Sequence, residues 1–428
     1  MVNLKNMSLD LQILEVKDVR FGETTFFCDG LLTVNKEELL EACSDRHLVN
    51  YRAEVVYPGE SARIIPVKDV IEPRCKTDSG EFYPGILGGF EQVGEGKTTV
   101  LRGCNVVTAG QIVFYQEGLI DMSGPGADYC IFSKTINVVV MADPVDGLGH
   151  AEHETAVRMM GLKAAHYLAK AVKETPADKV EHYELPPVDP TKKLPRIAYV
   201  SMVLAQGLLH DNYVYGINAS RLHTMFMSPM EYMDGAVVSG NCVTASCKTM
   251  TYDHCNNPVI LELMKRHGKD LEFVGVITSP ITASLGDKNR GVMGCMLTAR
   301  QVGVDAMFIG YEGGGNPESD IMMLCAKAEK WGIKTVMMCH ENAGWDGVNP
   351  GLAMVTPEAD AVVAVGNNNE RIILPPMDRI VGDLESIKLL AGAPASPLYP
   401  DGSILTALST IIASTSNIGI LNLGCLTY

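Results

Sequence analysis

The sequence has 428 residues, of which 46% are hydrophobic and 20% are charged, and its formal net charge is −16. A chain of this length can bury a large core in two or three domains, and the composition is that of a soluble globular protein rather than a disordered one. The negative charge is spread over both halves, whereas phosphate binding requires clustered Lys and Arg. Nucleic acid is therefore not expected as a partner.

Cysteine spacing and the chain ends bear on the cellular compartment. Twelve cysteines lie scattered between Cys28 and Cys425 without a C-x-x-C pair, which predicts reduced thiols and a cytoplasmic protein. The first residues contain no apolar run followed by a small-residue cleavage site, so no signal peptide is expected. Residues 402–428 carry no charge, but Ser, Thr and Asn recur among them. We expect a buried terminal element with a turn at 415–417 and no membrane anchor.

Residues 1–145 alternate short apolar runs with Gly, Pro and Asp, a pattern that predicts a strand-rich N-terminal region. The spacing then changes, and apolar residues recur at helical intervals from His150 to about Lys173. Residues 174–195 are rich in Pro and in charged residues, which is typical of a linker or a long surface loop. The second segment, 146–195, is therefore expected to be a helix followed by a linker.

Two histidines at the start of this helix allow a metal interpretation. His150 and His153 are three residues apart and would share a helix face, and Asp143 and Asp146 lie just upstream. The alternative is a charged, solvated first turn, where acidic side chains are favourable near a helix N-terminus. No third ligand is fixed by spacing, so no metal is assigned to the site.

Residues 196–428 form an α/β unit in which apolar runs alternate with helical patterns. Asn257-Pro258 and Asn316-Pro317 each supply a cap and a first-turn proline for a helix. The expected strands are 197–202, 236–238, 273–277, 306–310, 334–339 and 361–365, and the expected helices are 258–266, 290–301 and 316–330. This alternation predicts a largely parallel sheet covered by helices on both faces, with function at the carboxyl ends of its strands.

Three segments with chemical potential follow expected strands and should meet at that edge: Cys242, Gly313–Gly315 and His340-Glu341. The glycine loop leads into a helix, so its backbone N–H groups could hold a carboxylate. The alternative for Gly313, Gly314 and Gly315 is a plain tight turn.

Cys242 follows Gly240 and Asn241, residue types that favour a tight turn with close approach of another group. In a strained turn its thiol can attack the carbonyl of Asn241 and exchange an amide for a thioester. β-Elimination would cut the chain and leave a dehydroalanine that hydrolyses to a pyruvoyl group, whose carbonyl accepts an amine as a Schiff base. The alternative is a small buried residue at a strand end.

The run SGNCVTASCK at 239–248, followed by TYDHCNNP, resembles the processing site of the proprotein of component B in the glycine, sarcosine and betaine reductase complexes. Further segments similar to this family are IPVKDVIEPR (65–74), QEGLIDMSGPGADY (116–129), QGLLHDNYVYG (206–216) and ILPPMDRIVG (373–382). The resemblance therefore spans nearly the whole chain.

The resemblance implies that Cys242 becomes the catalytic pyruvoyl group and that cleavage before it gives chains 1–241 and 242–428, with the sheet straddling the cut. It also implies partners: a separate selenium-containing subunit of component B, a selenoprotein component A whose selenol attacks the activated amino acid, a component C that forms acetyl phosphate, and thioredoxin. Glycine is the simplest substrate, and sarcosine and betaine stay open. The alternatives are a proline reductase proprotein and a non-catalytic α/β binding or scaffold subunit.

Overall fold

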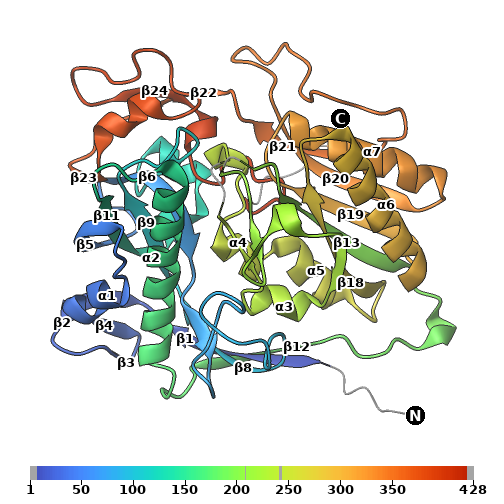
Figure 1. Cartoon of the computed structure of the whole chain (residues 1–428), viewed down its shortest axis with the longest axis horizontal. Coiled ribbons are helices and arrows are strands. Elements are labelled where there is room, and N and C mark those ends of the chain that lie inside the picture. The colour runs from blue at the N-terminus through green and yellow to red at the C-terminus, as the bar shows by residue number, and fades with distance from the viewer. Residues whose placement is uncertain (1–6, 208, 241–242, 422–428) are drawn as a thin grey trace.

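The computed structural model describes residues 7–207, 209–240 and 243–421. It is a mixed α/β structure with several sheets. Figure 1 shows the N-terminal sheets with helix α2 (His150–Ala171) on the left and a helix-covered sheet on the right.

The N-terminal region is strand-rich, as the sequence predicts. Its largest sheet has the order β10-β6-β9-β11-β5, with β23 beside β6, and a second sheet has the order β12-β1-β8-β7. The bounds are β1 Ser8–Glu15, β5 Leu48–Val56, β6 Ala62–Ile71, β7 Arg74–Lys76, β8 Gly96–Arg102, β9 Cys104–Gly110, β10 Gly118–Asp121, β11 Ile136–Pro144, β12 Lys179–Glu184 and β23 Arg379–Gly382. A small sheet of β2 (Asp18–Gly22), β4 (Leu31–Asn35) and β3 (Phe26–Cys28) precedes α1 (Lys36–Ala42).

The second large sheet has the order β16-β18-β13-β19-β20-β21 and is parallel except for the edge strand β16. Its strands are β13 Arg196–Leu204, β16 Met225–Met227, β18 Glu272–Ile281, β19 Ala306–Tyr311, β20 Lys334–Glu341 and β21 Val362–Asn367. The five parallel strands have the doubly wound order 2-1-3-4-5. In sheets of this order the strand order reverses beside the first strand, and ligands bind outside the carboxyl ends at that point. Here the switch point lies between β13 and β19.

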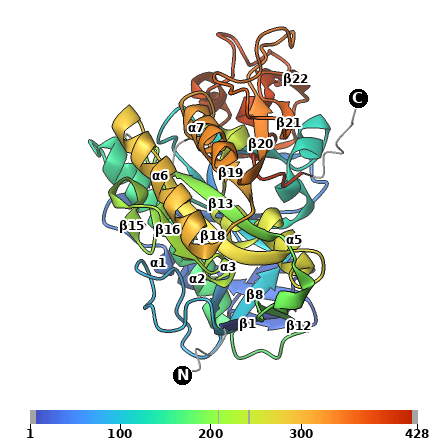
Figure 2. The same ribbon diagram turned by 90° about the vertical axis from the view of Figure 1, so that its right-hand side faces the viewer.

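Helices cover both faces of the parallel sheet because successive residues of its central strand point to opposite sides. Val200 and Leu204 share one core with α6 (Leu285–Val302) and α7 (Asn316–Lys330), which lie in front of the sheet in Figure 2. Tyr199 and Val203 share another core with α5 (Pro258–Arg266). The three helices and all six strands expected in this region are present, five of the strands in the parallel sheet, and α6 begins earlier than its predicted start at residue 290.

Two expectations about local structure are wrong. The run 236–238 is not a strand of the parallel sheet: β17 (Val237–Val238) pairs with β14 (Tyr213–Val214), which also pairs with β15 (Ile217–Asn218). A short apolar run does not specify its partner strand, and here Gly235, at φ 73°, turns the chain onto β14 after α3 (Pro229–Met233). The segment 174–195 also contains a strand, β12, because alternate side chains of that charged stretch pack beside β1.

The C-terminal segment returns to the N-terminal sheets. Strand β23 pairs with β6, and β22 (Arg371–Leu374) pairs with β24 (Ile404–Ala407) above β6 in Figure 1. Residues 403–418 are buried except for the half-buried Leu405, and the chain turns after Ile411, as expected of a terminal element. No helix within the described ranges has the length and apolar character needed to cross a membrane. The division at residues 145 and 195 into domains stays a prediction.

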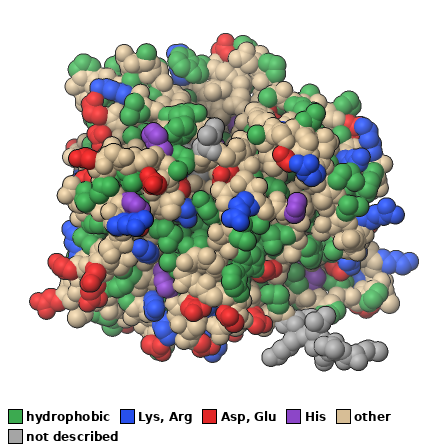
Figure 3. All heavy atoms as spheres, viewed as in Figure 1, with side chains coloured by type: hydrophobic (Ala, Val, Ile, Leu, Met, Phe, Trp, Pro, Cys, Tyr) green, Lys and Arg blue, Asp and Glu red, His purple; other side chains and the backbone are tan. Residues whose placement is uncertain are grey.

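Side chains on the face in Figure 3 are unevenly distributed. Asp and Glu gather along its lower edge, whereas Lys and Arg stand apart from one another among apolar and neutral side chains. This face therefore presents no continuous basic stripe of the kind that follows a phosphate backbone.

Candidate functional site

The candidate site lies at the carboxyl ends of β13 and β19, the switch point of the parallel sheet. Cys242 and Asn241 lie outside the described residues, but both flanks are described. Downstream, Val243 packs in one core with Leu204 and Tyr311, which end these two strands. A Cβ added to Gly313 would lie 3.6 Å from Val243 Cγ1, so the downstream flank borders the glycine loop.

Backbone hydrogen bonds hold the segment that follows. The carbonyl of Ala245 accepts from Ala413 N at 2.9 Å, and the carbonyl of Ser246 accepts from Thr415 N at 2.9 Å. The carbonyl of Cys247 accepts from Gly313 N at 3.4 Å. The chain downstream of position 242 is therefore fixed between the C-terminal segment and the glycine loop.

Upstream, Gly240 is packed as closely as the sequence predicts. A Cβ on Gly240 would lie 2.6 Å from Tyr213 Cδ2 and 3.0 Å from the carbonyl oxygen of Asp211. Only glycine fits at this separation, because real Cβ atoms essentially never approach other atoms within 3.0 Å.

One buried lysine, Lys68, contacts Gly240 and a second, Lys248, contacts Lys68, and sequence reasoning did not assign either to the site. Lys68 Nζ donates to the Gly240 carbonyl at 3.3 Å and lies 3.4 Å from Glu154 Oε1. Lys248 Nζ donates to the Lys68 carbonyl. Burial raises the pKa of the nearby Asp69 carboxyl, and attraction to Lys248 opposes that rise. No local pattern reveals Lys68, since it lies on a fully buried strand and its partner is far along the chain.

The charged cluster continues towards α2. Burial raises the pKa of Glu117 to about 7, and the charge of Lys68 opposes the shift. His153 is buried, which lowers its pKa, while His150 Nδ1 lies 2.9 Å from the carbonyl of Val113. Within the described residues no group of three or more His, Cys, Asp or Glu side chains could hold a metal ion.

Glu312 directly follows β19 and is 2% exposed. Its Oε2 accepts from Asn212 Nδ2 at 2.6 Å and from Leu204 N at 3.4 Å, and its Oε1 accepts from Thr249 N at 3.1 Å. Burial nevertheless raises its pKa to about 7. The glycine loop was singled out because it directly follows a strand at the functional edge of the sheet. Glu312 directly follows the same strand, so the same rule could have identified it.

The glycine loop is confirmed as the connection between β19 and α7. Gly313 and Gly315 have φ of 76° and 74°. Gly315 N donates to Glu318 Oε1 at 2.9 Å, so the buried Glu318 carboxylate caps α7. Gly313 N donates to the Cys247 carbonyl, and the Gly314 N–H has no acceptor among the described parts of the chain. Carboxylate binding by Gly313, Gly314 and Gly315 stays a prediction, with Gly314 as the remaining donor.

His340 lies beside this loop, as predicted for residues at the same sheet edge. A Cβ on Gly314 would lie 2.7 Å from His340 Cε1. His340 Nδ1 lies 3.0 Å from Asn417 Oδ1, and Asn417 Nδ2 donates to the Gly313 carbonyl at 3.3 Å. Burial lowers the pKa of His340, so the ring is neutral near pH 7. His340 and Asn417 thus join the C-terminal segment to the loop.

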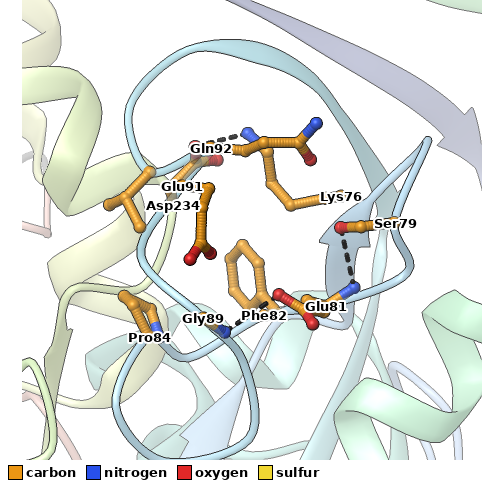
Figure 4. Close-up of a pocket in the computed structure, with 10 residues that line it drawn as sticks. Lys76, Ser79, Glu81, Phe82, Pro84, Gly89, Glu91, Gln92 and Asp234 are labelled. Carbon is orange, nitrogen blue, oxygen red and sulfur yellow. Dashed lines mark hydrogen bonds and ion pairs between the residues drawn. The ribbon is translucent and has the colours of Figure 1, made fainter.

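A separate pocket, shown in Figure 4, lies around Lys76 and Asp234. Lys76 Nζ and Asp234 Oδ2 are 2.6 Å apart, and Asp234 also accepts from Gly94 N and Thr98 Oγ1. These polar atoms are paired with one another. We therefore interpret Lys76 and Asp234 as a structural ion pair and not as a binding site.

The ten cysteines that the structure describes are free, and burial raises the pKa of most of their thiols. None of these described cysteines therefore has a lowered thiol pKa that would let it replace Cys242 as a nucleophile.

Comparisons with known proteins agree with the resemblance read from the sequence. The family described as glycine/sarcosine/betaine reductase component B subunits matches residues 7–425. A protein of Acetoanaerobium sticklandii named glycine reductase complex component B subunits alpha and beta is 47% identical over 430 residues, covering 99% of this chain and 100% of the relative. In Peptoclostridium acidaminophilum, a sarcosine reductase complex component B subunit alpha is 45% identical (96% and 97% covered) and a betaine reductase counterpart is 35% identical (96% and 98%). No solved structure gives a significant match.

Proposed function

Because this chain belongs to the family of glycine, sarcosine and betaine reductase component B subunits, we propose that it is the substrate-binding component B of a glycine reductase complex. In this proposal Cys242 is the catalytic residue and the precursor of a pyruvoyl group. The bond between Asn241 and Cys242 is cut, which gives chains 1–241 and 242–428.

The described surroundings of position 242 fit such a group. A pyruvoyl carbonyl supplies an electrophile that takes up a substrate amine as a Schiff base and weakens the substrate C–N bond. Such chemistry requires a dry site with fixed charges and a group that exchanges protons near neutral pH. Lys68 on the Gly240 carbonyl and the buried Glu312 beside the downstream flank meet these requirements.

The substrate carboxylate is assigned to the downstream side, at Gly313–Gly315. Gly314 N–H is the donor there, because Gly313 and Gly315 donate within the chain. On the upstream side, where the substrate amine would lie, Lys68 donates to the Gly240 carbonyl and its charge is balanced by Glu154 at 3.4 Å. Together the two flanks select a small amino acid with both an amine and a carboxylate.

Glycine is proposed as the substrate because its primary amine forms an ordinary imine. Sarcosine, a secondary amine, forms an iminium, and betaine cannot condense with a carbonyl because its nitrogen is quaternary. Relatives named for glycine and sarcosine have 47% and 45% identity, and the betaine relative has 35%, which supports an amine with a free N–H.

The proposed partners follow the family resemblance. They are a selenium-containing subunit of component B, the selenoprotein component A that delivers the selenol, the acetyl-phosphate-forming component C and, downstream, thioredoxin. The relatives are named as parts of multi-component complexes, which supports a need for partner subunits. We place this reductive deamination in the cytoplasm, where thiols and selenols stay reduced.

The observation that carries the proposal is the family match over residues 7–425, and both described neighbours of the proposed cut, Gly240 and Val243, are buried at the carboxyl edge of the parallel sheet. Intact-mass measurement of native protein should find chains 1–241 and 242–428, the second without a free α-amine. Borohydride should trap labelled glycine on chain 242–428 alone. One uncut chain with an intact Cys242 would instead support a non-catalytic scaffold subunit, and trapping of proline in place of glycine would support a proline reductase proprotein.

A further inference from the structure

Glu312 joins three segments that meet at the switch point. Its carboxylate accepts from Leu204 at the end of β13, from the Asn212 side chain and from Thr249, beyond the proposed cut. The carboxyl thus lies between the segments that border both described flanks: Asp211, next to Asn212, contacts Gly240, and Gly313, next to Glu312, contacts Val243.

A second buried polar group lies behind Glu312. His254 belongs to α4 (Thr251–Cys255) and is 2% exposed. Its Nε2 is 3.8 Å from Glu312 Oε1, and no hydrogen-bond partner for this nitrogen lies in the described part of the chain. Burial lowers the pKa of His254 to about 3, so the ring is neutral and Nε2 can accept or donate a hydrogen bond according to the tautomer.

A small cavity lies between these groups and the two central strands. It is lined by Tyr199, Thr249, His254, Tyr311 and Glu312 among others and has a volume of about 10 Å³. The Tyr311 hydroxyl is also buried without a partner in the described residues. A space of this size with several polar walls suits one water molecule, and buried polar atoms normally do have a partner.

We propose that Glu312, with His254 behind it, is the proton-transfer group of this site. The inference rests on the proposed function, because it concerns the condensation of an amine with a carbonyl. That condensation forms a C–N bond and releases one water, whose oxygen leaves only after it is protonated. Glu312 gives this proton and takes one back from the nitrogen. The carboxyl therefore ends as it began, and no electrons are exchanged.

The electrostatic surroundings suit this role. A carboxyl with a pKa of about 7 is close to half protonated at neutral pH, where a general acid is most effective. The titratable groups near it are His254 and Asp253 on α4, Tyr199 on β13 and Cys247, besides Tyr311. Burial raises the pKa of the acidic groups and lowers that of His254.

The test compares the purified complex with variants in a reaction that needs no turnover. Hydroxylamine adducts on chain 242–428 are timed by intact mass from pH 5.5 to 9, and each rate is expressed as a ratio to the concentration of unprotonated hydroxylamine. The wild-type ratio should fall tenfold per pH unit above about pH 7, because the protonated carboxyl is the active form. Glu312→Gln should lower the ratio at pH 6 by about 10²–10⁴-fold and remove the change of slope near pH 7, because only acid from the solvent then remains.

Two further variants separate proton transfer from structure. Glu312→Asp keeps a carboxyl, so it should retain a pH-dependent ratio at a reduced rate. Asp320→Asn removes another buried carboxylate, the partner of Lys288 in the α6–α7 contact, and should leave the pH profile unchanged. Wild-type protein that forms no adduct would contradict the proposed function itself. Adduct formation with an unaltered pH profile in Glu312→Gln would overturn only the role of Glu312.

An infrared titration provides a readout independent of adduct formation. The infrared spectrum of Glu312→Gln is subtracted from that of wild type, which leaves the band of the protonated Glu312 carboxyl. As the pH is raised, this band should disappear with a midpoint near pH 7. A midpoint near the ordinary value of 4.5 would contradict the proposal even if the variant folds poorly.

Discussion

Gly240→Ala is a sharp test of the packing around the proposed cut. The new Cβ would lie 2.6 Å from Tyr213 Cδ2 and nearer still to Cε2, whereas ordinary contacts begin at 3.4 Å, so the ring or the backbone must move by more than about 0.8 Å. Overpacking of this kind typically costs about 1–3 kcal/mol. The movement also displaces the Gly240 carbonyl from Lys68 Nζ, which now lies 3.3 Å away.

Displacements near 1 Å can cost about 10²-fold in rate where reacting groups must be aligned. We therefore expect Gly240→Ala to slow cleavage before residue 242 by about that factor and to lower the free energy of unfolding by about 1–3 kcal/mol. Cleavage is followed by denaturing gel after pulsed expression, and stability is measured by urea unfolding of the uncut protein.

Gly286→Ala is the matched control, because a Cβ there meets nothing within 4 Å. It lies in the first turn of α6 and should leave cleavage unchanged while adding up to about 1 kcal/mol of stability. Tyr213→Ala removes the ring that obstructs the Cβ, so the double variant should lose less stability than the sum of the two single variants. Wild-type cleavage and stability in Gly240→Ala would refute this reasoning.

Three other predictions follow from the site and the sheet. Cys242→Ala should accumulate as one uncut chain that does not bind phenylhydrazine, as judged by intact mass; a cut chain would mean that another residue drives processing. Chains 1–241 and 242–428 should elute together in native gel filtration without a disulfide, and separate elution would contradict a shared sheet. Burial raises the pKa of Glu117 and of Glu312 to about 7, so the folded chain binds more protons than the unfolded chain between pH 4.5 and 7. The contribution of each carboxyl to the free energy of unfolding therefore falls by about 3 kcal/mol as the pH rises through that window. In urea unfolding, the free energy of unfolding of Glu117→Gln should rise relative to that of wild type between pH 5 and 8.

Local signals explain what the sequence predicted well. Asn257 Oδ1 accepts from Val259 N at 3.0 Å and Ile260 N at 3.2 Å, so the expected cap of α5 is present. Caps depend on residues two or three positions apart, and the strand–helix alternation depends on runs of about ten. The parallel sheet, its helix cover and the meeting of the glycine loop with His340 follow from such short-range patterns.

Long-range partners explain what the sequence did not predict. Lys68 is separated from Gly240 by 172 positions, and Asn417 is separated from Gly313 by 104. No periodicity relates such positions, because their proximity arises only when the C-terminal segment and β6 close on the parallel sheet. Strand β17 found a different partner for the same reason.

The place of the proposed cut follows from the strand order. Strand β13 is the first of the five parallel strands in the chain and lies between β18 and β19, which come after the cut. The connection from β13 to β18 therefore leaves at the switch point, and residues 241 and 242 belong to it. Cleavage there breaks no ladder between β13 and its neighbours, so the central strand of one chain stays hydrogen-bonded on both sides to the other. This loop starts at the ligand-binding edge, and the only strand that its described residues contribute to the large sheet is the edge strand β16. Its backbone can therefore be converted into a reactive group without loss of the fold.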